Sequence, residues 1–104
     1  MPFDGTEGSQ IDLAEAVSWT SNYRATGGEV YAHFFGRDIL QEILAQEDCM
    51  GIRIYYALDD EGVGQLILVG VSAEEEDLYE GIVAERSIRC PGSSCSSHSP
   101  LNGG

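Results

Sequence analysis

Two neighbouring strand-like segments, separated by a short turn, constrain the fold of this 104-residue chain most strongly. Residues 52–58 alternate apolar side chains with polar or smaller ones, which is the period of a β-strand. Residues 59–64 (DDEGVG) have the composition of a turn, and residues 66–71 (LILVGV) form a second, more uniformly apolar segment. The pattern predicts an antiparallel β-hairpin.

The second segment is apolar on both of its faces, and this affects how the hairpin can be covered. Leu66 and Leu68 share one face, while the alternate residues occupy the other. Two helices can cover one face of a small sheet, so the second face needs the C-terminal tail, another layer or another molecule. A lone hairpin is also marginal and leaves two unpaired edges. We therefore expect self-association through an interface formed by Arg53, Tyr55, Ile67, Val69 and Val71.

Helical patterns precede the hairpin. Residues 10–24 have apolar side chains near helical spacing and are followed by Thr26-Gly27-Gly28. A second helical stretch is expected from about Glu29, with a kink at Gly36 and a longer helix over residues 39–46. These segments predict an α+β fold in which two or three N-terminal helices pack on the antiparallel hairpin.

The remaining segments are shorter and less regular. Residues 78–83 favour a short closing helix or a third strand. We predict a flexible lead-in over residues 1–8, a single α+β domain over residues 9–89, and an irregular Cys/Ser/Gly-rich tail over residues 90–104.

The charge of the chain excludes several classes of partner. Eighteen acidic residues against five arginines, with no lysine, give a formal net charge of −13. This charge repels phosphate backbones and anionic lipids, so neither nucleic acid nor a membrane is expected as a partner. A basic protein is compatible with it. The N-terminus lacks the features of a signal peptide and no apolar run reaches membrane-spanning length, so the cytoplasm, with reduced thiols, is the default location.

The tail contains the residues best suited to specific chemistry. Cys90, Cys95 and His98 lie within nine residues, and the third cysteine, Cys49, lies upstream beside the first strand. The four side chains are a possible zinc set, although only one short ligand knuckle is present. The same turn would suit a Cys90–Cys95 disulfide, and free thiols in a tail are the third alternative. The sequence leaves these alternatives open.

Four parts of the chain carry a resemblance to other proteins. They are residues 38–46 (DILQEILAQ), residues 49–55 (CMGIRIY), residues 68–71 (LVGV), and the closing Cys90-Pro91, Cys95 and Leu101-Asn102. In these parts the chain resembles a group of small bacterial proteins with a GIRIY strand and a Cys-Pro…Cys…Leu-Asn C-terminal segment. The resemblance implies that the tail belongs to the protein. It implies no activity.

The sequence contains no recognisable catalytic motif, and we predict no catalytic residues. The expected function is that of a non-enzymatic, acidic structural or interaction module that forms homo-oligomers through its sheet and aromatic residues. The tail would serve as a cover or an inter-subunit strap, and no cofactor is required. The alternative is a small metal- or thiol-dependent protein that uses the Cys/His cluster of the tail.

Overall fold

The computed structural model describes residues 2–92 and 94–103 and shows an α+β fold. A three-stranded antiparallel sheet has the strand order β2-β3-β4, and a separate two-stranded sheet pairs β1 with β5. The contacts divide the chain into two compact units, one comprising residues up to Gly8 and Phe34–Ser87, the other Ser9–His33 and Ile88–Gly104. The grouping differs from the predicted single domain with a separate tail, because tail residues group with the first helix.

The predicted hairpin is confirmed and organises the first unit. Strands β2 (Cys49–Leu58) and β3 (Gly64–Ser72) pair in an antiparallel register that aligns Leu58 with Gly64 and Ile54 with Leu68. The turn between them is stabilised by Asp59, whose carboxylate accepts hydrogen bonds from the backbone N–H groups of Glu61 and Val63, each at 2.9 Å. The short strand β4 (Val83–Ala84) pairs with β3. Of the two alternatives for residues 78–83, a closing helix or a third strand, the structure therefore has the strand, although it begins only at Val83.

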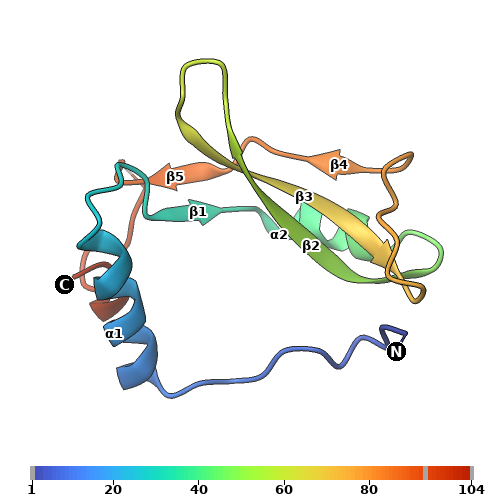
Figure 1. Cartoon of the computed structure of the whole chain (residues 1–104), viewed down its shortest axis with the longest axis horizontal. Helices are drawn as coiled ribbons and strands as arrows, with labels where there is room; N and C mark the ends of the chain where they lie inside the picture. The colour runs from blue at the N-terminus through green and yellow to red at the C-terminus, as the bar shows by residue number, and fades with distance from the viewer. Residues whose placement is uncertain (1, 93, 104) are drawn as a thin grey trace. The chain divides into compact units, whose positions relative to one another are not determined.

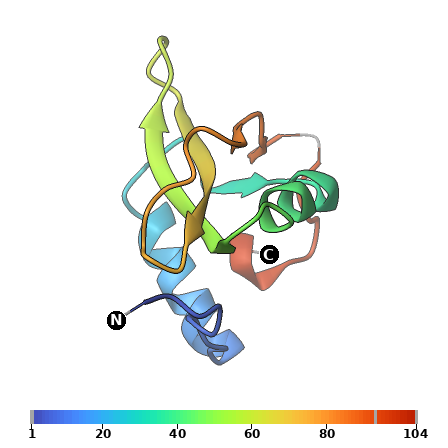
Figure 2. The ribbon, with the colours of Figure 1, turned by 90° about the vertical axis from the view of Figure 1, so that its right-hand side faces the viewer.

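Helix α2 (Arg37–Leu44) covers one face of this sheet. Ile43 of this helix is fully buried and packs with Leu68 and Ala84 in the core. The half-buried side chains of Ile39 and Ile52 pack against this core. Figures 1 and 2 show α2 beside the part of the hairpin that is remote from the turn. The turn end of the hairpin therefore extends beyond the helix that covers the rest of the sheet.

The second predicted helix is wrong in its first half. Residues 29–36 form no helix, and Ala32–Phe34 is strand β1, which pairs with β5 (Ile88–Cys90). Gly36 is the N-cap of α2 and not a kink within it, because its extended backbone ends the strand-like segment before the helix begins. The apolar residues on either side of Gly36 have the spacing of a single helix face. Those before Gly36 nevertheless belong to the segment of strand β1, and those after it belong to helix α2.

The second unit contains α1 (Leu13–Arg24) and most of the tail. The helix begins three residues later than expected and packs against a 3₁₀ turn, η1 (Pro100–Asn102). The guanidinium of Arg24 donates to the carbonyl oxygen of Leu101 at 2.6 Å. The tail was expected to be irregular, but it supplies η1 and Cys90, the last residue of β5, to this unit.

The second face of β3 is better covered than the sequence indicated. Val69 and Val71 are each only 3% exposed within the single chain. The lead-in contributes to the first unit here, since the N–H of Phe3 donates to the carbonyl oxygen of Ala73 at 2.8 Å and its ring lies 5.8 Å from the Arg53 guanidinium carbon. These two valines are therefore core residues and offer little surface to another molecule.

Candidate functional site

The most exposed apolar surface of the first unit lies on β2. Ile54, Tyr56 and Leu58 are 54%, 93% and 76% exposed, and they lie on one face of the strand because alternate residues share a face. We call these three side chains the β2 row. Leu68, the cross-strand neighbour of Ile54, is buried under α2, whereas Tyr56 and Leu58 lie nearer the turn end of the hairpin. Burial thus falls along a single face from the α2 end to the turn end.

The backbone of β2 is available along the same residues. In the strand order β2-β3-β4, β2 is an edge strand. The N–H of Asp59 donates to the carbonyl oxygen of Val63 at 3.0 Å, so the backbone groups of Asp59 point toward β3. In an antiparallel pair only every second residue points its backbone groups toward the partner strand. Ile54, Tyr56 and Leu58 therefore direct their N–H and C=O groups outward. Within residues 2–92 and 94–103, no backbone hydrogen bond is made to these outward groups.

The opposite face of β2 carries a polar cluster. The Arg53 guanidinium lies 2.8 Å from one carboxylate oxygen of Asp77, and the hydroxyl of Tyr55 donates to the other oxygen. Because this hydrogen bond favours the protonated phenol, it raises the pKa of Tyr55 above its usual value. Asp77 also forms a β-bridge with Val71, so the cluster ties the loop after β3 to β2. Arg53 and Tyr55 are predicted interface residues, and here they bind within the chain.

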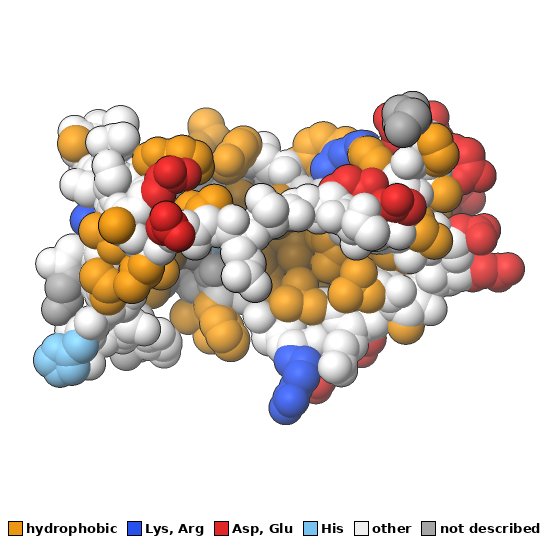
Figure 3. Space-filling view, turned by 90° about the horizontal axis from the view of Figure 1, so that it is seen from below, with side chains coloured by type: hydrophobic (Ala, Val, Ile, Leu, Met, Phe, Trp, Pro, Cys, Tyr) orange, Lys and Arg blue, Asp and Glu red, His pale blue; other side chains and the backbone are white. Residues whose placement is uncertain are grey.

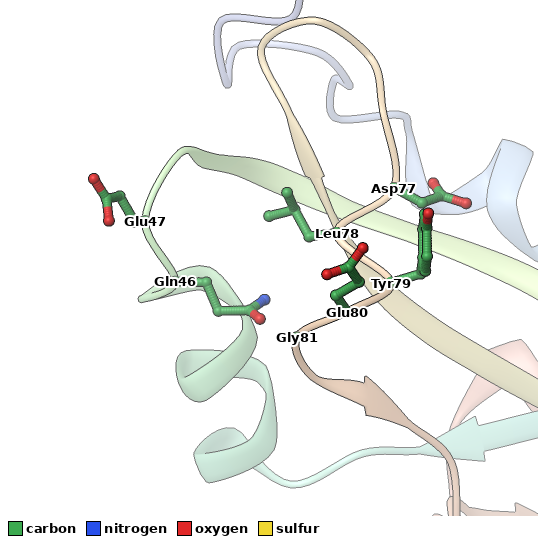
Figure 4. Close-up of a pocket in the computed structure, with 7 residues that line it drawn as sticks. All are labelled: Gln46, Glu47, Asp77, Leu78, Tyr79, Glu80 and Gly81. Carbon is green, nitrogen blue, oxygen red and sulfur yellow. The ribbon is translucent and has the colours of Figure 1, made fainter.

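A cavity of about 420 Å³ lies near the C-terminal end of α2, next to the segment between β3 and β4. Figure 4 shows it with its lining residues, which are Gln46, Glu47, Asp77, Leu78, Tyr79, Glu80 and Gly81. The side chains of Glu47 and Asp77 point away from Gln46 on opposite sides. These two carboxylates therefore do not converge on one point, and among the described residues no three His, Cys, Asp or Glu side chains are grouped here to hold a cation.

Gln46 fills much of the space between α2 and this segment. Its side-chain oxygen accepts a hydrogen bond from the N–H of Ile82 and its side-chain nitrogen donates to the carbonyl oxygen of Ile43, both at 2.9 Å. Gly70 and Gly81 make room for it, because a Cβ at either position would lie within 2.9 Å of a polar Gln46 atom. Gln46 was not among the predicted site residues, and in the sequence only Gly70 and Gly81 give a signal for it.

The cysteines divide between the two units. Cys90 and Cys95 form a disulfide with a Cα–Cα distance of 5.9 Å, which is one of the alternatives left open by the sequence, and reduced thiols were wrongly expected for this pair. Cys49 is a half-buried free thiol that donates to the carbonyl oxygen of Gly51 at 3.2 Å. His98 is exposed. Across the described ranges, no three His, Cys, Asp or Glu side chains are grouped so as to hold a metal ion.

Charge and exposed apolar side chains coexist on the surface. The face in Figure 3 shows hydrophobic side chains among acidic ones, with fewer basic ones. Of the five predicted interface residues, Val69 and Val71 are buried and Arg53 and Ile67 are half-buried. Only Tyr55 is exposed, at 44%. The β2 row was not among the predicted site residues. Its alternating apolar pattern was recognised as a strand, but the pattern alone does not reveal how far α2 extends over it.

Comparison with known proteins identifies no relative. No protein-family model, curated protein or solved structure matches the chain. The resemblance to small bacterial proteins therefore stays a prediction. In the part of the chain that the structure describes, none of the helices has the length and apolar character needed to cross a membrane.

Proposed function

We propose that this protein is a non-enzymatic interaction module that self-associates through its three-stranded sheet and the aromatic residues of β2. The observation that carries the proposal is the β2 row on an edge strand, with Tyr56 93% exposed. Edge strands of natural proteins are usually protected by lysine, proline, a bulge or a covering segment. Residues 54–58 (IYYAL) contain no charged residue and no proline. A partner that pairs with this edge would bury the row.

Other parts of the sequence-based proposal have less support. The expected surface on Val69 and Val71 is buried, so the proposed interface moves to the other face and to the edge of β2. The tail contacts α1 in its own unit, which gives no independent support to a role as an inter-subunit strap. A basic protein is the second proposed partner, and only the formal net charge of −13 supports it. The proposed cytoplasmic location is opposed by the Cys90–Cys95 disulfide, because disulfides persist best in oxidising compartments.

The experiment that tests the proposal is light scattering on the purified protein over a micromolar concentration series. We expect the mean mass to rise above that of the 11.2 kDa monomer with concentration. Tyr56→Arg should shift the protein toward monomer, since it puts a charge into the β2 row, which the proposed interface would bury. Tyr79→Arg is the matched control, because Tyr79 is 71% exposed but lies outside the strands. A monomer at every concentration contradicts the proposal.

A further inference from the structure

We propose that two copies of the chain pair their β2 strands antiparallel about a two-fold axis at Tyr55, forming one continuous six-stranded sheet. This inference rests on the proposed self-association and specifies its geometry. Each copy contributes a three-stranded sheet in which β2 is an edge. A two-fold axis makes the contact self-complementary, so the assembly closes as a dimer.

The backbone permits this arrangement. The outward N–H and C=O groups of β2 belong to the even-numbered residues, because Asp59 and the alternate residues before it bond to β3. With Tyr55 on the axis, Ile54 of each copy lies opposite Tyr56 of the other. Both residues have outward groups, so each such pair exchanges two hydrogen bonds. Tyr55 then forms the central pair without hydrogen bonds, in which the two Cα atoms are about 4.5 Å apart.

The side chains favour this register over its neighbours. An axis at Tyr55 places Ile54 opposite Tyr56 and Ile52 opposite Leu58, so every member of the β2 row meets an apolar residue. An axis at Tyr56 would instead place Ile52 opposite Asp60. An axis at Ile54 would place Leu58 opposite Met50, where the ladder with β3 is irregular between Cys49 and Gly51. The register centred on Tyr55 therefore gives Ile52 and the whole β2 row apolar partners along the regular part of the strand, and Asp60 lies opposite Met50 only at the irregular end.

The charge of the turn selects the antiparallel orientation for a second copy. The turn Asp59-Asp60-Glu61 follows β2 directly and carries three acidic groups. In a parallel pair the two turns would lie side by side and repel each other. In the antiparallel pair they lie at opposite ends, and Asp59 faces the neutral Gly51 of the other copy. The strand is thus complementary to itself in this one orientation.

Cysteine cross-linking tests the geometry in the full chain with Cys49→Ser, which removes the free thiol. Tyr55→Cys should form an intermolecular disulfide rapidly under mild oxidation, since its paired Cα atoms would be within disulfide range. Leu58→Cys is the control on the same strand. In the proposed register its two copies are six residues apart along the strands, about 20 Å, and should cross-link at least about tenfold more slowly.

A second pair of variants avoids any effect of losing the Tyr55 hydroxyl. Ile54→Cys and Tyr56→Cys, mixed in equal amounts, should form the mixed disulfide faster than either forms its own homodimer. Equal cross-linking at residues 55 and 58 would overturn the antiparallel register. A dimer in light scattering without cross-linking at residues 54–56 would overturn this inference and leave self-association standing. A monomer at every concentration would overturn both.

Discussion

At the scale of single residues, Gln46 shows how a polar side chain replaces apolar packing between two elements. It bonds to backbone groups of Ile43 and Ile82, and it occupies space that Gly70 and Gly81 leave open. An added Cβ at Gly81 would lie 2.2 Å from the Gln46 side-chain oxygen. The contact can be relieved only if Gln46 moves and gives up its hydrogen bond to Ile82.

Gly81→Ala should therefore lower the free energy of unfolding by about 1–3 kcal/mol. Urea denaturation measures this change. Gly51→Ala is the control, because a Cβ there meets no atom within 4 Å, and it should change stability little. In a Gln46→Ala background the cost of Gly81→Ala should fall, since the obstructing atom is gone. Equal costs in both backgrounds would rule out the proposed contact.

Tyr55 provides a pH-dependent test of the polar cluster. Its hydrogen bond to Asp77 raises its pKa in the folded state above the usual value of about 10. The bond therefore stabilises the fold fully below pH about 10, and this contribution is lost as the pH rises through the raised folded pKa. The tyrosinate absorbance of the native protein minus that of Tyr55→Phe should show Tyr55 deprotonating above its usual pKa. Asp77→Asn should move the deprotonation of Tyr55 to lower pH. An unchanged titration of Tyr55 in Asp77→Asn would contradict the role given to this hydrogen bond.

At the scale of secondary-structure elements, α2 is oriented by one fully buried residue. Ile43 is 0% exposed and its neighbour Leu44 is 49% exposed, so a single step along the helix separates core from surface. Ile43→Ala should lower the free energy of unfolding by about 2–4 kcal/mol in urea denaturation. Leu44→Ala should change it by about 0.5 kcal/mol or less. Similar costs for both would mean that α2 packs through a different face.

The hairpin could be predicted from sequence because its two signals, period-two alternation and a turn, act over neighbouring residues. Asp59 then fixes the turn through its own local hydrogen bonds. Strand β1 could not be predicted, since its pairing partner β5 lies far along the chain and each strand has only three residues. The disulfide was one of several alternatives for Cys90 and Cys95. The β2 row was missed because exposure depends on where α2 ends, which is a tertiary property.

At the scale of the whole molecule, net charge opposes the proposed association. Two chains of formal charge −13 repel each other at long range, and salt screens this repulsion. Raising NaCl from about 0.02 M to about 0.5 M should therefore lower the apparent dissociation constant several-fold. Sedimentation velocity over a concentration series at each salt level measures it. Weaker association at high salt would indicate an interface held by ion pairs and would contradict an apolar β2 contact.

The second unit is built from two stretches of sequence separated by nearly all of the first, and this sets an order of folding. Residues 9–33 and 88–104 must close a long loop before β1 and β5 can pair, whereas the β2–β3 contacts close only a short turn. Folding of residues 34–87 shortens that loop. We expect pulse-labelled hydrogen exchange to show amide protection in β2 and β3 before α1, and simultaneous protection would contradict this order.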